Sequence, residues 1–281
     1  MKVIDVHIHP IFKELIEEKP ALLDFQRDVF DLHTSPQPIQ ALISQMEEKD
    51  VELGILLPID CTTRWGKEFP SNEDVAKIVE KYPDHFVGFA SVDPNDPNSI
   101  EKLEFAVKKL GLRGLKLHPS LQGFDPSSDS TEKVLTKAEE LEIPVLVHTG
   151  IVWQKKHSIR CCNPLIWDEL ASKHENLNII MAHFGWPWVW DAVVVAIRNR
   201  NVYLDTSDTF TGTPKEHFNE IFKRRIPERI PKRFLGERIL FGSNSPRIEL
   251  LHMVEGISEL DIDEELKRDI LYTNSKRLFD L

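Results

Sequence analysis

The sequence predicts an α/β protein, a closed (β/α)8 TIM barrel that forms a single domain over residues 1–281. Short apolar runs rich in β-branched residues alternate with amphipathic helical patterns along the whole chain, which is typical of βαβ units. Most runs are apolar almost throughout, as in parallel strands that are covered on both faces. The length also fits, because α/β barrels of about 250 residues fold as one unit. An open doubly wound sheet is the second choice, but no glycine-rich phosphate loop follows the first run.

The apolar runs define the expected strands. Each is short and bounded by turn-forming residues, and each is followed by a helical pattern. The strands are expected at residues 3–9, 53–58, 86–93, 114–118, 144–148, 178–183, 202–205 and 239–243.

The helices between these strands are predicted from their caps and apolar periodicity. Ser35 followed by Pro36 predicts the start of a helix whose apolar stripe extends through Met46. Ser71, followed by acidic residues, predicts the start of the next helix. A helix over 99–110 ends before Gly111, and others are expected at 131–141, 164–174, 188–198, 214–226 and 263–272.

Composition restricts the classes of partner. The 46 acidic and 35 basic residues give a net charge of −11, which disfavours nucleic acid and acidic membrane surfaces. No charged leader precedes the first strand, and no apolar run approaches the roughly 18 residues of a membrane span. We therefore expect a cytoplasmic protein that acts on a small-molecule substrate, with a homodimer as the default assembly.

The first strand ends in two histidines, His7 and His9, followed by Pro10. Side chains two residues apart lie on the same face of a strand, and proline disfavours its continuation. Neutral imidazoles that point the same way from a strand end are suitable metal ligands. The pair therefore predicts part of a metal site.

Other histidines fall at comparable positions. About one of the 11 histidines would lie at a strand end by chance, whereas five do: His7, His9, His118, His148 and His183. A single histidine would more often be an ordinary core or surface residue. Because barrel active sites form at the carboxyl ends of the strands, the five together predict a metal site there.

The fourth strand adds a cation to this end of the barrel. Lys116 and His118 share a face, so both side chains can reach one cavity and bind substrate. A surface salt bridge is the alternative for Lys116, but its neighbours Leu115 and Leu117 favour a buried strand.

Several motifs resemble the amidohydrolase superfamily, in particular its amidohydrolase-related (amidohydrolase 2) branch of metal-dependent hydrolases and decarboxylases. The resemblance implies a barrel with one or two divalent ions on the opening histidine pair, zinc being expected first and manganese second. The motifs cover nearly the whole chain: DVHIH at 5–9, GLKLHP at 114–119, VHTG at 147–150, AHFGWPW at 182–188, NVYLDTS at 201–207, ILFGSNSP at 239–246 and NSKRLF at 274–279.

The resemblance also implies roles for individual residues. His7, His9 and His148 are the expected metal ligands, and His183 is either a ligand of a second ion or the catalytic acid/base. The eighth strand would supply an aspartate that binds the metal and handles a proton. This chain has Asn244 at that catalytic and metal-binding position.

Asn244 changes what the site can do. An asparagine keeps one carbonyl oxygen, but it has no negative charge and accepts no proton at neutral pH. Three explanations remain open: an engineered inactive variant that binds without turnover, a natural enzyme with altered chemistry, or a non-catalytic binding protein.

The resemblance favours a hydrolase first. A divalent ion lowers the pKa of its bound water toward about 7. The hydroxide formed in this way would cleave a small-molecule amide, lactone or other ester. Lys116 or Arg160 would neutralise a substrate carboxylate.

The alternative is a metal-dependent decarboxylase that removes carbon dioxide from an aromatic or unsaturated acid without oxidation. Trp186 and three other tryptophans of the expected rim loops (Trp65, Trp153 and Trp188) could sandwich a flat ring. Three arginines that follow strand ends, Arg64, Arg160 and Arg247, could bind its carboxylate. Packing of these rings onto the barrel is an equally reasonable interpretation.

Overall fold

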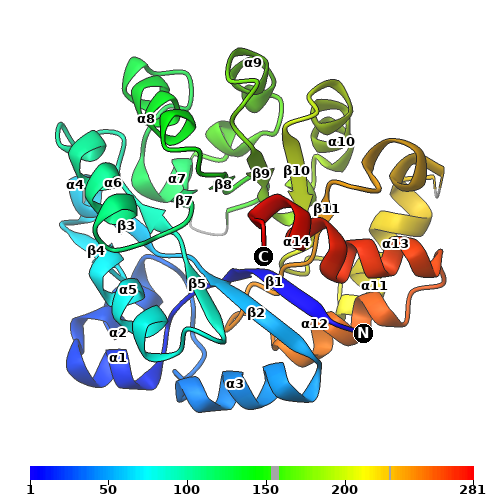
Figure 1. Ribbon diagram of the computed structural model, residues 1–281, viewed down its shortest axis with the longest axis horizontal. Coiled ribbons are helices and arrows are strands. Elements are labelled where there is room, and N and C mark those ends of the chain that lie inside the picture. The colour runs from blue at the N-terminus through cyan, green and yellow to red at the C-terminus, as the bar shows by residue number, and fades with distance from the viewer. Residues whose placement is uncertain (153–157, 228) are drawn as a thin grey trace.

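Eight parallel strands close into a barrel within residues 1–152, 158–227 and 229–281, the ranges that this computed structural model describes (Figure 1). Helices surround the barrel, so the predicted (β/α)8 fold is confirmed. Strands β11 and β1 close the ring, because Val6 N donates to Phe241 O at 2.9 Å. In barrel order the strands are β1 (Val3–Ile8), β2 (Val51–Leu56), β5 with β6 (Phe86–Gly88 and Ala90–Ser91), β7 (Leu115–Leu117), β8 (Val145–Val147), β9 (Ile179–Met181), β10 (Val202–Asp205) and β11 (Ile239–Leu240).

Side chains alternate between the barrel interior and the layer beneath the helices. On β8, Leu146 belongs to the interior cluster, whereas Val145 and Val147 pack in the outer cluster. Burial on both faces explains why most strands are apolar almost throughout. At the amino-terminal end of the barrel, Phe279 packs against Phe89 with ring centroids 5.9 Å apart.

The predicted helices are present, with ends shifted by a few residues. Ser71 begins its helix with a capping box, in which its Oγ accepts from Asp74 N at 3.1 Å. Residues 214–226 form α11 (Pro214–Asn219) followed by a π-helical segment (Glu220–Arg225). The other outer helices are α3 (Ile39–Glu48), α5 (Asn72–Lys81), α6 (Ser99–Lys108), α8 (Asp129–Glu140), α9 (Ile166–Lys173), α10 (Val189–Arg198), α12 (Leu250–Ser258), α13 (Glu264–Arg268) and α14 (Asn274–Phe279).

Two predictions about these helices were wrong or incomplete. The helix expected from Ser35 begins at Ile39, because Gln37 forms a parallel bridge with Phe12 and Pro38 keeps an extended backbone. Pairing with another segment therefore overrides the local helix signal. Helix α12 was not predicted, although its apolar residues have helical spacing.

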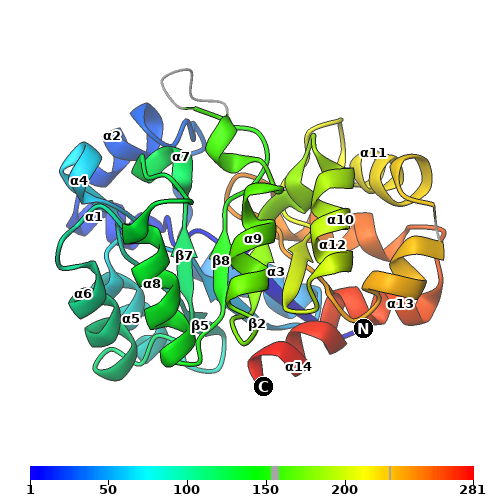
Figure 2. The ribbon, with the colours of Figure 1, turned by 90° about the horizontal axis from the view of Figure 1, so that it is seen from above.

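The carboxyl end of the barrel carries short insertions that the strand and helix pattern did not predict. Their apolar residues form a separate cluster that includes Phe25 and Phe69, whose ring centroids are 5.4 Å apart. In Figure 2, α2, α4 and α7 lie at the upper edge of the molecule, whereas α14 and both termini lie at the lower edge. The insertions are α1 (Lys13–Glu18), α2 (Ala21–Asp28), the β3–β4 hairpin (Ile59–Cys61 and Lys67–Phe69), α4 (Thr62–Trp65) and α7 (Pro119–Gln122).

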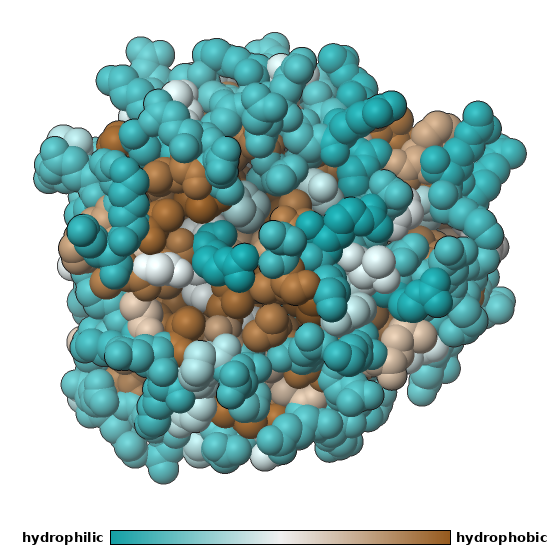
Figure 3. Space-filling model, in the orientation of Figure 1, coloured by the Kyte–Doolittle hydropathy of each residue, from teal (hydrophilic) through white to brown (hydrophobic). Residues whose placement is uncertain are grey.

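The face with α14 and the termini shows apolar patches framed by hydrophilic side chains (Figure 3). Within the described ranges, no helix combines the length and apolar character needed to cross a membrane. Dimerisation of this chain stays a prediction.

Candidate metal centre

The five histidines predicted at strand ends lie together at the carboxyl end of the barrel. The ring centroid of His7 is 5.2 Å from that of His9 and 5.0 Å from that of His183. The ring of His148 is 4.8 Å from His183 and stacks on His118 at 3.8 Å. All five side chains are buried. The fold therefore brings together residues that are up to 176 positions apart in the chain.

The backbone around these residues is held by neighbouring strands and by left-handed turns. His7 O accepts from Asn244 N at 2.8 Å, and His183 N donates to Asp205 Oδ1 at 2.8 Å. His183, Asp208 and Asn244 have φ values of 60°, 68° and 64°. Such backbone costs about 1–3 kcal/mol per residue and persists where the surroundings determine the conformation. The turns direct these side chains toward the end of the barrel.

A buried hydrogen-bond network connects four of the strand ends, those of β1, β8, β9 and β10. His7 Nδ1 lies 2.8 Å from Asp205 Oδ2, and Ser207 Oγ lies 3.0 Å from the same nitrogen and 2.8 Å from His183 Nδ1. His183 Nε2 lies 3.1 Å from His148 Nδ1. Because a carboxylate accepts, the proton of His7 is on Nδ1, and Nε2 carries the free lone pair.

Two sets of atoms in this region could hold a cation. In the first, His7, His183 and Asp205 each offer an atom, and these atoms lie within 4.8 Å of one another. However, His7 and Asp205 already bond to each other, and the Ser207 hydroxyl contacts all three residues. The first set is therefore better described as the support of the site than as its ligands.

The second set adjoins a cavity at the carboxyl end of the barrel, whose described wall includes His9, Lys116, His148, His183, Asp208 and Asn244. Within the described residues, His7 Nε2, His148 Nε2 and Asn244 Oδ1 are buried without a hydrogen-bond partner. His9 Nδ1 bonds to Leu57 O at 3.0 Å, which leaves its Nε2 as the available nitrogen. Buried polar atoms without partners are rare, and nitrogen and oxygen atoms suit zinc or manganese. These residues fit a divalent metal, which the sequence motifs predict for them.

The protonation of the histidines also suits metal binding. Burial is the largest cause that lowers the pKa of His7, His9 and His148 well below the ordinary value, and it lowers that of His183 to about 3. The nearby Lys116 ammonium acts in the same direction on all four. Neutral imidazoles are the form that binds metals.

Lys116 is the cation of the cavity wall. It points inward from β7, whereas Leu115 and Leu117 pack in the outer cluster. Its side chain is 1% exposed, and burial lowers its pKa to about 7. Among the described residues, none forms a hydrogen bond or ion pair within 4 Å with Lys116 Nζ. A buried ammonium in this setting is suited to an anionic ligand.

His118 and Trp186 occupy different positions relative to the cavity. His118 lines it and caps α7 with its ring nitrogen. Trp186 stacks on Phe210, with ring centroids 4.7 Å apart, and Phe210 lies 6.2 Å from His183. Trp186 therefore lies behind an intervening ring rather than in the wall.

The loop residues expected near the substrate are mostly elsewhere. Arg160 is exposed and does not line the cavity within the described residues, because its loop leaves the guanidinium in solvent. Trp65 and Trp188 also lie outside the lining, and Trp153 is not among the residues that the structure describes.

Two further residues line the cavity wall: Asp208, which the sequence did not predict, and Arg247, which was considered only as a carboxylate ligand. Asp208 follows β10 by three positions, and its Oδ2 accepts from Asn244 Nδ2 at 2.9 Å. Arg247 follows β11, donates to Phe30 O at 2.8 Å and lies over the Phe30 ring. Their positions just beyond strand ends are the only sequence signal for them.

Gly150, two residues after His148, lies close to the backbone of the 185–186 segment, and its replacement tests this close approach. Its φ is 95°, and a Cβ atom there would lie 2.5 Å from Trp186 O. We expect Gly150→Ala to lower the free energy of unfolding by about 2–4 kcal/mol, through backbone strain and displacement of the 185–186 segment. Gly111 has a φ of 72° but nothing within 4 Å, so Gly111→Ala should cost only about 1–2 kcal/mol. Equal effects in urea unfolding would contradict the close approach.

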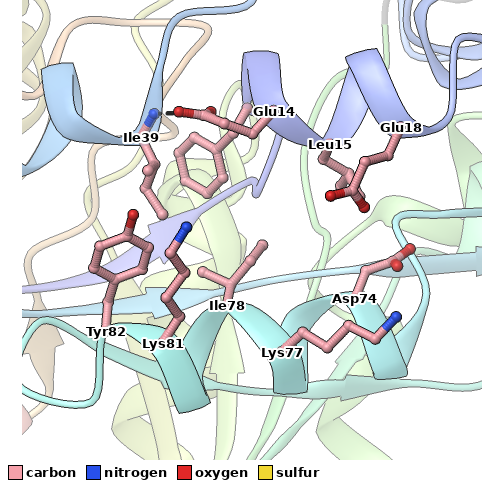
Figure 4. Close-up of a pocket in the computed structure, with 10 residues that line it drawn as sticks. Glu14, Leu15, Glu18, Ile39, Asp74, Lys77, Ile78, Lys81 and Tyr82 are labelled. Carbon is pink, nitrogen blue, oxygen red and sulfur yellow. Dashed lines mark hydrogen bonds between the residues drawn. The ribbon is translucent and has the colours of Figure 1, made fainter.

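A separate groove lies on the outside of the barrel between α1 and α5 (Figure 4). It encloses about 140 Å³ and is lined by apolar and charged side chains, including Leu15, Ile78 and Lys81. Glu14 accepts there from Ile39 N at 3.2 Å. No histidine lines this groove within the described residues, so it carries none of the metal-site chemistry.

Comparison with known proteins identifies the family of the chain. The family model described as amidohydrolase matches residues 4–281, so the chain belongs to the amidohydrolase family, whose members are divalent-metal enzymes. A gamma-resorcylate decarboxylase of a Rhizobium species is 23% identical, and the match covers 75% of each chain.

Solved structures show the same fold. An uncharacterised TIM-barrel protein of Bordetella bronchiseptica is 21% identical, with a TM-score of 0.76 over 100% of this chain and 99% of that one. A mutant 5-carboxyvanillate decarboxylase of Novosphingobium aromaticivorans, solved with bound manganese, is 16% identical, with a TM-score of 0.69 over 100% and 97%. The named relatives therefore favour the decarboxylase alternative over the hydrolase.

Proposed function

We propose that this protein is a metal-dependent decarboxylase of an aromatic carboxylic acid that has a hydroxyl group beside the carboxylate. The observation that carries the proposal is the cavity itself, where a buried lysine and an unsatisfied ligand set face one another. The names of the relatives support this reaction, since their acids, gamma-resorcylate and 5-carboxyvanillate, have that substitution.

The residues have complementary roles in the proposal. His7, His9 and His148, with Asn244 Oδ1, would hold manganese or zinc. The ion would supply positive charge that fixes the carboxylate and the neighbouring hydroxyl. Lys116 lines the same cavity wall and would pair with the carboxylate of the bound acid, which increases the affinity for it.

Decarboxylation needs one proton and no water. The bond between the ring and the carboxyl carbon breaks, carbon dioxide leaves, and the ring carbon retains the electron pair and takes a proton. His183 is the proposed residue that passes this proton, because it lines the cavity and contacts Ser207 and His148. Asn244 has no proton to exchange in this way.

Apolar side chains of the described cavity wall suit the ring of such an acid. Phe30, Leu121, Ile151 and Val152 lie beside the polar residues of the wall. The aromatic ring would pack against them, with its carboxylate directed toward the ligand set.

A substrate panel tests this function. We expect the protein loaded with Mn²⁺ or Zn²⁺ to release one carbon dioxide per molecule of a hydroxybenzoate such as 2,6-dihydroxybenzoate or 5-carboxyvanillate, and to lose this activity with a chelator. Matched esters and lactones serve as controls. Hydrolysis of a lactone without release of carbon dioxide would favour the hydrolase. Binding of metal and acid without turnover would instead favour a non-catalytic protein.

A further inference from the structure

Asp208 is the only carboxylate in the cavity wall among the described residues. Its side chain is buried, and two donors fix its orientation. Oδ1 accepts from Thr209 N at 2.7 Å, and Oδ2 accepts from Asn244 Nδ2 at 2.9 Å. The left-handed backbone at Asp208 turns the chain just after β10, so the carboxylate returns to the end of the barrel.

Asn244 connects this carboxylate to the ligand set. Because its Nδ2 donates to Asp208, its Oδ1 lies on the other side of the amide, buried and without a partner in the described chain. An aspartate at 244 would instead place two carboxylates at hydrogen-bond distance, which is unfavourable unless one is protonated or a cation lies between them. The amide and the carboxylate are therefore a complementary pair.

The charges around the cavity explain why a divalent ion there needs a carboxylate beside its ligands. The described wall contains two basic side chains, Lys116 and Arg247, and burial lowers the pKa of its residues His9, His148 and His183. Asp205 lies beneath the wall and is engaged by His7. Without Asp208, the described wall would offer a divalent ion only uncharged ligands and two basic side chains, with the negative charge of Asp205 lying beneath it, and this disfavours binding.

We propose that Asp208 supplies the negative charge of the metal site, and that Asn244 acts as a neutral ligand that positions Asp208. The charge that the amidohydrolase pattern places at the end of the eighth strand is thereby moved to the end of the seventh. This inference rests on the metal site of the proposed function, and not on the identity of the acid.

Charge-exchange variants test the proposal. We expect Asp208→Asn to weaken Mn²⁺ binding by about 10- to 100-fold, measured from free Mn²⁺ by electron paramagnetic resonance. The double variant Asp208→Asn with Asn244→Asp restores one carboxylate and should bind within about threefold of the original protein. Asn244→Asp alone should bind at least as tightly as the original protein. Asp60→Asn, which removes a buried carboxylate outside the cavity wall, is the matched control and should leave binding unchanged.

The possible outcomes distinguish failure of this inference from failure of the proposed function. Asparagine tolerates left-handed backbone as aspartate does, so Asp208→Asn should fold, and circular dichroism checks this. If the original protein binds Mn²⁺ and Asp208→Asn binds it equally well, the role of Asp208 is overturned while the metal site stands. A double variant no better than Asp208→Asn also overturns it. If the original protein binds no divalent metal, both proposals fail.

Discussion

Replacing His148 by alanine is expected to remove the bound metal and to lower the rate of decarboxylation by about a thousandfold. A metal ion contributes several kcal/mol to stabilisation of charge in a transition state, and about 4 kcal/mol corresponds to that factor. His148 offers a buried Nε2 without a described partner, so its loss removes a ligand directly. Metal content by mass spectrometry and the release of carbon dioxide measure the two effects.

Thermal unfolding provides an independent measure of the same change. A ligand that binds only the folded state raises the midpoint of unfolding. We expect Mn²⁺ to raise this midpoint for the original protein but not for His148→Ala. His217→Gln is the control, because His217 is equally buried and lies outside the cavity wall. A His148→Ala protein that retains a full equivalent of metal would contradict the proposed ligand set.

Replacing Lys116 by methionine is expected to change binding and stability in opposite directions. Loss of a buried charge contact with the acid should raise KM by about 100-fold. The unfolding free energy of the metal-free protein should rise by about 1–4 kcal/mol, because an ammonium that has no described hydrogen-bond partner is no longer buried. A purely structural lysine would not give both effects.

A second lysine provides the control for this experiment. Lys19 forms a salt bridge with Asp74 at 2.6 Å on the outside of the barrel. Lys19→Met should leave KM unchanged and should not stabilise the protein. An unchanged KM for Lys116→Met would exclude its role as the carboxylate anchor.

The barrel was predictable from the sequence because its signal is repeated along the chain. Each apolar strand contributes the same periodicity, and burial on both faces follows from the closed parallel sheet. The insertions at the carboxyl end have no such repetition. Helices such as Lys13–Glu18 are too short for periodicity, and the start of α3 is set by pairing of Gln37 with Phe12.

The candidate site was predictable where side chains lie on strand ends. His7, His148 and Lys116 come from regular strands or from the residue that follows them, so topology determines where they meet. Loop residues were harder, because spacing does not give the direction of a loop. Arg160 remains in solvent, whereas Asp208 reaches the cavity through a left-handed turn that no local pattern predicts.

The pair of Asn244 and Asp208 also changes the interpretation of the sequence. Considered alone, Asn244 suggests an impaired enzyme, since an amide cannot replace the charge of an aspartate. Its hydrogen bond to Asp208 supports the second explanation, a natural enzyme with altered chemistry.

The most direct test of the proposed reaction is to follow the proton in heavy water. The protein loaded with Mn²⁺ is incubated with 2,6-dihydroxybenzoate in D₂O, and the product is examined by nuclear magnetic resonance and mass spectrometry. The proposed reaction predicts release of carbon dioxide and one deuterium at the ring carbon that carried the carboxyl group. An intact carboxyl group across the whole panel of hydroxybenzoates, with an ester or lactone cleaved instead, would contradict it.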